Sequence, residues 1–387
     1  MLGRPASLPA AAVLLTAGLL VASLLAASLC SVAAAQPTAT ITGRVEDMRS
    51  GSSLPGAHVF ISESMIGTTT DSTGHFRLRG VPVGSKRLVV SMLGYEPKRI
   101  NLFLRPDTTA SMSFALAPTV IQGEEVVVEG ERDEDWYDDL RTFKRLFIGT
   151  SDLAEGCTLL NPKVLRFDSS WWKGLEAQAT APLRVRNDAL GYRLHYALEE
   201  FDQSGTVVKW DGDPHFEEMV PADSAEAARW QARRREAYRG SLRHFLRALL
   251  HDRVTAEGFR MQLLPRARAF RDIRRADRFP VSRDDLIVGR TDSTYVMRFR
   301  GRLEVTYRRE AETRGFVRWS RQHRRTRAVQ RSWIELNDPP ITIDRYGEIV
   351  EPYGATVFGY FAYEQRISGL LPRSYRPRND RPPTAWE

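Results

Sequence analysis

The sequence predicts a mainly β protein, with an N-terminal antiparallel β-sandwich followed by a β-rich α+β domain. Short segments of period-two alternation fill residues 38–116, and Gly, Pro, Asp and Ser stand at the breaks between them. This is the pattern of an all-β sandwich. Beyond residue 139, similar segments are mixed with segments of helical period. A chain of 387 residues is long enough for two domains after a targeting segment.

The first 35 residues have the features of a secretory signal peptide. Arg4 precedes an apolar run over residues 8–29, and Ala33 and Ala35 are the small residues that a cleavage site requires. The run is also about long enough to span a bilayer, so an uncleaved membrane anchor is the alternative. A lipoprotein signal at Cys30 is disfavoured because a Leu, not a small residue, precedes it. We expect an exported protein of the periplasm, outer membrane or cell surface.

Cleavage after residue 35 would leave Cys157 as the single cysteine of the mature chain. One thiol cannot form an internal disulfide, so the fold would depend on its core alone. No His or acid near Cys157 forms a recognisable catalytic pattern, and we expect this residue to pack as a small hydrophobe.

About seven strands are expected in the sandwich. The segments "TITGRVED" and "AHVFISES" place residues 41, 43, 45 and residues 57, 59, 61 on inward faces. The turn "GTTTDSTG" leads into "HFRLRG", and "KRLVVSMLGY", "RINLFL" and "TASMSFAL" complete the set. In that turn, Asp71 can cap backbone donors and Gly74 can take a positive φ. A calcium loop at Thr70, Asp71 and Ser72 would need several more oxygen ligands than the turn supplies.

These segments resemble the carboxypeptidase regulatory-like domain, which has a transthyretin-like (prealbumin-like) fold. The matching motifs are Gly-x-Val at 43–45, Leu-Pro-Gly-Ala-x-Val at 54–59, the turn at 67–76, Val-Pro-x-Gly at 81–84 and Leu-Gly-Tyr at 93–95. The resemblance implies a non-catalytic sandwich, often found at the front of TonB-dependent receptors in Bacteroidota-type bacteria. The rest of this chain is too short for a receptor's plug and barrel and lacks regularly spaced lipid-facing strands, so a receptor is not expected.

The expected organisation has four parts: a signal peptide at 1–35, the sandwich at 36–118, an acidic linker at 119–138 and the second domain at 139–387. Residues 124–139 hold nine acids and one Arg, a net charge of −8. The linker is expected to enter a helix that places Leu140, Phe143 and Phe147 on one face.

The second domain mixes strands and helices. "LGYRLHYALEEF" and "TVVKWDGDPHFEEM" predict a hairpin, and Asp223 and Ser224 are expected to cap one helix that runs to about His251. Further strands are expected at "GFRMQLL", "DLIVGR", "STYVMRFRGRLEVTYRRE" and "RSWIELN". Segments such as "YRGSLRHFLRALL" and "ISGLLPRSYRP" resemble a group of exported Bacteroidota proteins whose β-rich domain is uncharacterised.

The formal net charge of +8 is unevenly distributed. Residues 223–333 hold 29 Arg and Lys against 13 acids, a net charge of +16. An exported protein rarely meets nucleic acid, so no nucleic-acid partner is expected. The basic region is expected to be a solvated face, compatible with association with an anionic membrane surface.

No catalytic, cofactor-binding or metal-binding residue is assigned, and no cofactor is expected. The sharpest enzymatic alternative is a zinc carboxypeptidase, with His215 and Glu218 of "HFEE" and His323 as ligands. It is disfavoured because a chance His-x-x-Glu has roughly even odds in a chain of this composition, cationic residues surround His323, and the βαβ pattern of a metallocarboxypeptidase is missing. His195 is expected to pack its ring on a strand rather than act as a base.

Paired carboxylates also fail to predict a catalytic site. The pairs Glu199–Glu200 and Glu217–Glu218 are adjacent on strands, so the two members of each pair should point to opposite faces.

The function expected is a non-catalytic binding or interaction protein of the cell envelope, with the sandwich as scaffold or docking module. The partner would be an envelope protein or a glycan. Four tryptophans could form a stacking platform for a carbohydrate or could equally belong to the hydrophobic core. They are Trp171, Trp172, Trp210 and Trp230. The alternative is an exported hydrolase, peptidase-like and zinc-dependent or not, with its site in the C-terminal domain. A pocket with converging titratable groups would favour the enzyme, and a flat or aromatic groove would favour binding.

Overall fold

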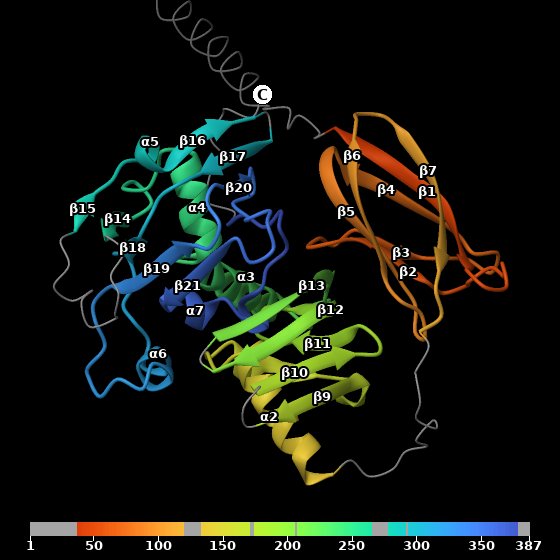
Figure 1. Ribbon diagram of the computed structural model, residues 1–387, viewed down its shortest axis with the longest axis horizontal. Helices are drawn as coiled ribbons and strands as arrows, with labels where there is room; N and C mark the ends of the chain where they lie inside the picture. Colours follow the sequence, from red (N-terminus) through yellow and green to blue (C-terminus); the bar gives the residue numbers. More distant parts are fainter. Residues whose placement is uncertain are drawn as a thin grey trace, which may run out of the picture.

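The computed structural model describes residues 37–119, 133–170, 174–205, 207–264, 278–291 and 293–377. The fold is mainly β, with an N-terminal β domain and a β-rich α+β region after it, as predicted (Figure 1). The expected signal peptide, the acidic run 120–132, and Trp171 and Trp172 lie outside the described residues. Within the described ranges, no helix is long and apolar enough to cross a membrane.

The N-terminal domain is a sandwich of two sheets, with strand orders β4-β1-β7 and β3-β2-β5-β6. Alternation directs Ile41, Val45, Val59 and Leu78 between the sheets, where all four are buried. The seven strands are β1 (Thr38–Asp47), β2 (His58–Ile61), β3 (Gly67–Thr69), β4 (His75–Pro82), β5 (Gly84–Ser91), β6 (Lys98–Leu104) and β7 (Thr109–Leu116).

One strand pair departs from the predicted antiparallel pattern. β1 and β7, the first and last strands of the sandwich, run parallel from the pair Thr40–Thr109 to the pair Asp47–Leu116. Alternation within a strand fixes which face is buried but carries no information on the direction of its neighbour, so the sequence could not show this pairing. The turn before β4 forms as expected: Asp71 accepts hydrogen bonds from the backbone N–H groups of Thr73 and His75, and Gly74 has φ +78°.

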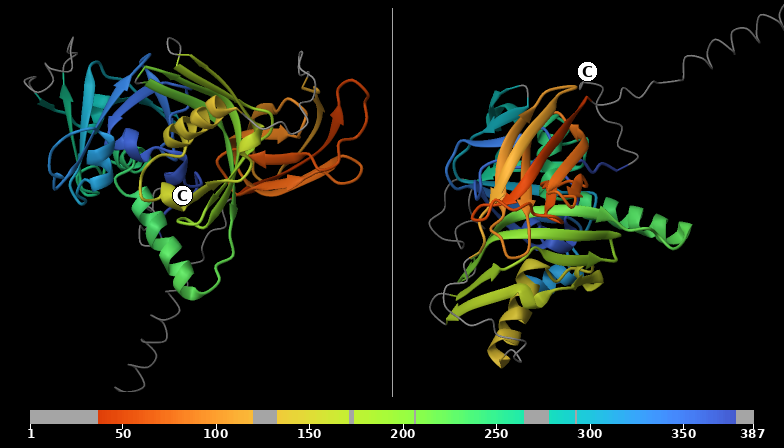
Figure 2. Two further views of the ribbon diagram at one scale, coloured as in Figure 1. Left: turned by 90° about the horizontal axis from the view of Figure 1, so that it is seen from below. Right: turned by 90° about the vertical axis from the view of Figure 1, so that its right-hand side faces the viewer.

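A six-stranded sheet forms the first part of the C-terminal region and wraps around one helix. The sheet has the order β8-β11-β12-β10-β9 with β13 paired to β12, and Figure 2 shows the helix α2 inside its curve. Phe143 and Phe147 of that helix stack on each other and pack on the sheet. The elements are α2 (Glu134–Phe147), β8 (Cys157–Leu159), β9 (Leu165–Ser170), β10 (Gly174–Ala179), β11 (Leu183–Asn187), β12 (Tyr192–Ser204) and β13 (Val207–Glu218).

The helix α2 begins earlier than the sequence indicated. Asp133 caps it by accepting the backbone N–H of Trp136 at 2.9 Å, so its first turn occupies residues that were expected to be linker. Buried Trp136 explains the difference, because an aromatic contact to the sheet extends the helix into an acidic segment.

A second core lies around α4, between a five-stranded sheet of order β15-β14-β18-β19-β21 and a three-stranded sheet of order β16-β17-β20. Its strands are β14 (Phe259–Leu264), β15 (Phe279–Pro280), β16 (Ile287–Arg290), β17 (Thr294–Met297), β18 (Arg302–Tyr307), β19 (Gln330–Leu336), β20 (Ile341–Asp344) and β21 (Ala355–Gly359). The helices of this region are α3 (Ser224–Tyr238), α4 (Leu242–Leu250), α5 (Arg283–Leu286), α6 (Arg314–Trp319) and α7 (Tyr360–Glu364), with 3-10 turns η1 (Ala154–Gly156), η2 (Pro162–Val164) and η4 (Ile367–Gly369).

The single helix expected over residues 224–251 is two helices. Asp223 caps α3 as predicted, but the helix ends before Gly240, which has φ +71°, and Ser241 caps α4. The periodicity continues through the break, so the pattern alone concealed it. The break lets α3 project from the body while α4 enters the second core (Figure 2).

The sandwich docks on the outer face of β12 and β13, along a seam with its own small core of Phe60, Val89 and Ala197. Asp213, which is fully buried, accepts a hydrogen bond from Nε of Arg99 at 2.6 Å. The Glu63 N–H also donates to the Pro214 carbonyl at 2.7 Å. The N-terminal domain is therefore held against the C-terminal region by apolar, ionic and backbone contacts.

Candidate functional site

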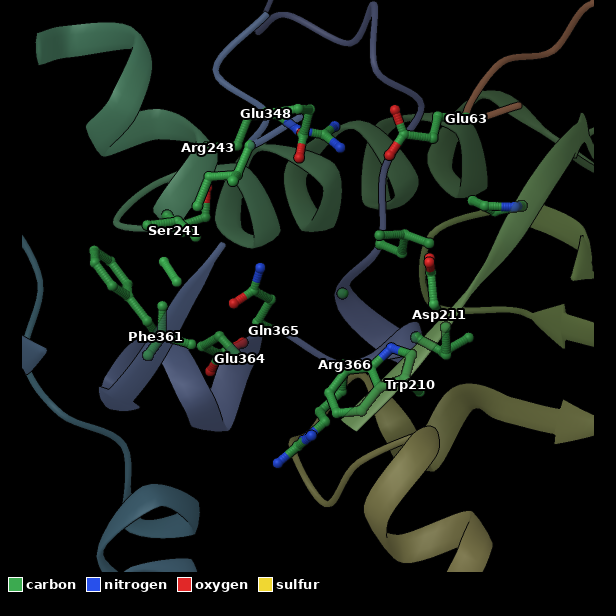
Figure 3. A pocket seen from close by; sticks show the side chains of 18 of the residues that line it. Glu63, Trp210, Asp211, Ser241, Arg243, Glu348, Phe361, Glu364, Gln365 and Arg366 are labelled. Atoms are coloured by element: carbon green, nitrogen blue, oxygen red, sulfur yellow. The ribbon is translucent and has the colours of Figure 1, made fainter. Parts of the chain in front are cut away.

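A pocket of about 400 Å³ lies where the sandwich, β13 and the C-terminal segment meet (Figure 3). The sandwich supplies Glu63 from the turn after β2, and β13 supplies Trp210 and Asp211. The start of α4 supplies Arg243, and the segment 347–371 supplies further lining residues, among them Glu348 and Glu364. A volume of this size is in the range of small-molecule sites in proteins.

Several charges of the pocket are already neutralised within the protein. Arg243 pairs with Glu348 and donates to the carbonyl oxygens of Leu371 and Pro372 at 2.9 and 3.1 Å. Glu63 lies 3.6 Å from Nε of Arg373. Burial raises the pKa of Glu348, and the Arg243 charge opposes that rise. These groups set the shape and polarity of the pocket and are not free to attack a substrate.

Of the aromatic residues that line the pocket, Trp210 and Tyr353 are the two that are not buried. The guanidinium carbon of Arg366 lies 4.7 Å from the centroid of the Trp210 ring, and burial lowers the pKa of Arg366 to about 10. Tyr353 is exposed, has φ +55° and donates its hydroxyl to Glu200 at 2.7 Å. A positive φ is unusual for a bulky residue, and such strain clusters at functional sites.

Glu364, at the end of α7, is a second carboxyl of the pocket with a perturbed pKa. Burial raises the pKa of Glu364 to about 7, and the neighbouring charges of Glu236 and Asp152 add to the effect. Glu364 also lines a second cavity of about 510 Å³ that contains Glu236, Asp152 and Glu310. Burial raises the pKa of Glu310 as well. A carboxyl that holds its proton near neutral pH has the property of a general acid.

The zinc ligands considered from the sequence do not come together. Glu218 pairs with Arg234 at 2.5 Å, and His323 is exposed between α6 and β19. Among the described residues, the group of side chains placed to hold a metal is instead His58, His215 and Glu217.

Adjacent carboxylates also have separate partners. Glu199 lies 3.3 Å from Nε of Arg99, whereas Glu200 accepts the Tyr353 hydroxyl. Glu217 lies 3.3 Å from Nε2 of His195, which belongs to a cluster of histidines at the seam.

That cluster joins His58 of β2, His195 of β12 and His215 of β13. The His58 ring centroid is 5.4 Å from that of His195 and 5.2 Å from that of His215. Burial lowers the pKa of His215 to about 3, with the charges of His58 and His195 adding to the effect, so the imidazole is neutral. The arrangement provides nitrogen ligands of the kind that zinc and related ions take.

Trp230 and Cys157, which were also singled out from the sequence, contribute to packing rather than to a site. Trp230 is buried and donates Nε1–H to the Asp188 carbonyl at 2.9 Å, which holds α3 to the sheet. Burial raises the pKa of the half-buried Cys157 thiol to about 12, so it is a poor nucleophile. Among the tryptophan candidates that the structure describes, Trp210 lines the pocket and Trp230 does not.

Sequence reasoning missed Glu63, Tyr353, Glu364 and His58. A signal for the seam was present: residues 59–61 of β2 and 88–90 of β5 are continuous apolar runs, which indicate strands covered on both faces. Tyr353 and Glu364 carry no such signal, because their importance depends on a backbone angle and on burial.

Comparison with known proteins identifies the N-terminal part. Residues 41–128 match the model of the CarboxypepD_reg-like domain. No curated protein sequence matches the chain.

Solved structures similar to part of the chain have low identity. They include 3-chlorocatechol 1,2-dioxygenase from Rhodococcus opacus 1CP (14% identity, 21% of this chain and 60% of that chain, TM-score 0.19). BcpA, the major pilin subunit of Bacillus cereus, has 11% identity over 21% of this chain and 31% of that chain, with a TM-score of 0.19. A cohesin–X-dockerin complex from Acetivibrio cellulolyticus has 18% identity over 29% of this chain and 76% of that chain, with a TM-score of 0.19. The chain thus spans less than two thirds of the dioxygenase and of the pilin.

The motifs between Gly43 and Tyr95, the two-sheet sandwich and the family match agree. The N-terminal region of this chain is a CarboxypepD_reg-like domain.

Proposed function

We propose that this chain is a non-catalytic binding protein of the cell envelope and that the pocket between the sandwich and the C-terminal region binds a glycan. The observation that carries the proposal is the composition of the pocket after its internal ion pairs are formed. Arg243 and Glu63 are neutralised by partners in the protein. What remains for a ligand is aromatic surface and hydrogen-bonding side chains, some of them charged, such as Lys209 and Asp211.

Sugars need this combination, because their C–H faces stack on aromatic rings and their hydroxyls pair with fixed polar groups. Trp210 and Tyr353 supply the rings. Asp211, Gln365 and Glu364 line the same pocket and supply acceptors and donors (Figure 3). In this proposal the sandwich is an internal scaffold, which contributes Glu63 and supports β13 from behind.

Export to the periplasm, outer membrane or cell surface is part of the same proposal. It rests on the signal-peptide pattern of residues 1–35 and on the occurrence of regulatory-like domains in exported Bacteroidota proteins. An envelope glycan is the ligand class that such a location would offer.

A hydrolase is the second candidate, and one observation favours it. Glu364 lies in the pocket with a pKa near 7, which is the property of a proton donor to a leaving group. In this alternative the ligand would be cleaved, and Glu364 would be the residue on which turnover depends.

The first test is direct binding of envelope oligosaccharides to the purified protein by calorimetry. The variants Trp210→Ala and Tyr353→Ala are each expected to weaken binding about tenfold or more, since a stacking ring contributes roughly 1 kcal/mol or more. Trp319→Ala is the matched control, because Trp319 is 38% exposed on α6 and lies outside the pocket. Equal losses in all three variants, or binding that survives both pocket variants, would refute the pocket as the site.

A further inference from the structure

The three histidines of the seam have no role in the pocket, yet they converge from both domains. His58 belongs to the sandwich, and His195 and His215 face each other on β12 and β13. The ligand atoms of His58, His215 and Glu217 lie within 4.8 Å of one another. Nε2 of His195 lies 3.3 Å from a Glu217 oxygen. Imidazole and carboxylate are the ligands that zinc takes in mixed sites.

His215 is the member whose environment lacks another explanation. It is 4% exposed, and neither ring nitrogen has a hydrogen-bond partner among the residues that the structure describes. A buried polar group without a partner costs about 1–3 kcal/mol, and native proteins rarely retain one. A bound ion would engage one of these nitrogens.

The sandwich covers His215 closely. The Phe216 N–H donates to the Ser64 carbonyl at 2.9 Å, which fixes the turn over the ring. Gly67 has no room for a side chain, because a Cβ there would lie 2.5 Å from Nε2 of His215. The backbone of the sandwich therefore encloses His215, whereas the side chains of His195 and Glu217, 23% and 43% exposed, leave the cluster accessible to an ion from solvent.

Among the charged side chains around the cluster, the carboxylate of Glu217 lies closest to the place where a cation would bind. Arg193 is in register with Glu217, and Arg184 is in register with His195. The side chains of both arginines are exposed, whereas Glu217 lies against the histidines. Glu217 thus places a carboxylate beside the imidazoles.

We propose that His58, His195, His215 and Glu217 bind one divalent transition-metal ion, zinc in the first instance, and that the ion joins the sandwich to the six-stranded sheet. Four ligands about 2.1 Å from a tetrahedral ion are about 3.4 Å apart. The ligand atoms of His58, His215 and Glu217 lie within 4.8 Å of one another, so they would have to draw closer around the ion. Imidazole nitrogens select zinc, copper or nickel over magnesium and calcium. The site is separate from the pocket, so each can be tested without the other.

The test is a zinc titration of the metal-free protein against a chromophoric chelator, with the protein purified without a polyhistidine tag. One equivalent of zinc per chain is expected. His58→Ala and His215→Ala should each lower the affinity about 100-fold, and Glu217→Gln about tenfold. The control is His323→Ala, an exposed histidine outside the cluster, which should leave the affinity unchanged.

Two further measurements keep the proposal falsifiable if His215→Ala does not fold. Cobalt(II) bound to the native protein should show the visible absorption bands of a tetrahedral site. These bands should be absent in His58→Ala, a substitution at a half-buried position. Zinc should also raise the unfolding temperature of the native protein and not that of His58→Ala. Binding of much less than one equivalent, or an affinity that His58→Ala leaves unchanged, would overturn the proposal.

Discussion

At the scale of single residues, burial gives two carboxyls of the pocket unusual pKa values. Glu364 and Glu348 both line the pocket, and burial raises the pKa of each. Glu348 has an arginine partner, whereas Glu364 is surrounded by other carboxylates. Glu364 is therefore a group through which pH should act on this protein.

The expected effect of Glu364 is a loss of stability as the pH rises. The pKa of Glu364 rises from 4.5 to about 7 on folding, so between these values the native state holds a proton that the unfolded chain has released. The free energy of unfolding should fall across this window by up to roughly 3 kcal/mol, and Glu364→Gln should abolish that part of the fall. Urea unfolding of both proteins at pH 4.5 and pH 8 measures the difference.

The matched control is Glu155→Gln, which changes an exposed carboxyl and should leave the pH dependence of the native protein intact. The same fall in Glu364→Gln as in the native protein would show that Glu364 ionises normally.

At the scale of elements, glycines with left-handed backbone angles determine where helices and strands end. Gly240 has φ +71°, and a Cβ there would lie 2.5 Å from Oε1 of Gln330 and 2.9 Å from the Tyr307 ring. It separates α3 from α4 and so allows Ser241 and Arg243 to face the pocket.

Gly240→Ala should therefore destabilise the protein by about 2 kcal/mol, since it combines backbone strain with overpacking. Gly205→Ala separates the two causes, because Gly205 also has a positive φ, +60°, but open space around it, and should cost only about 1 kcal/mol. Chemical denaturation of both variants gives the comparison. Equal costs would mean that crowding at Gly240 is relieved by movement of its neighbours.

Elements also show how far the sequence could predict the structure. Alternation in the segments of β1, β2 and β4, and in the hairpin β12–β13, predicted strands that the structure contains, because one buried face produces a two-residue period. The break at Gly240 and the parallel pairing of β1 with β7 depend on tertiary contacts that leave the period unchanged. The candidate site was the least predictable part, since Glu63, Trp210, Arg243 and Glu364 lie on four separate segments and meet only in the fold.

At the scale of the whole molecule, the seam makes the regulatory-like domain part of one structure with the C-terminal region. Phe60 is 1% exposed in the seam, and Asp213 is buried beneath Arg99 and Arg87. A buried carboxylate of this kind fixes the orientation of the partners more than it adds stability.

Phe60→Ala should cost about 3 kcal/mol and loosen the seam, because it leaves a cavity between the two domains. Hydrogen exchange should increase in β2, β12 and β13 together, as expected for a shared unit of local unfolding. The control is Phe103→Ala, since Phe103 of β6 is 72% exposed. Faster exchange in β2 alone would indicate that the domains are not coupled through this contact.

The most direct test of a non-catalytic binding pocket is the fate of a bound ligand. An envelope oligosaccharide that binds the protein would be incubated with it at equimolar concentration for many hours. The oligosaccharide would then be recovered and its molecular mass determined by mass spectrometry. Binding without catalysis predicts recovery of the intact oligosaccharide from both the native protein and Glu364→Gln. Two fragments whose masses add up to that of the oligosaccharide plus one water, formed by the native protein and not by Glu364→Gln, would contradict binding without catalysis. They would establish a hydrolase with Glu364 as its acid.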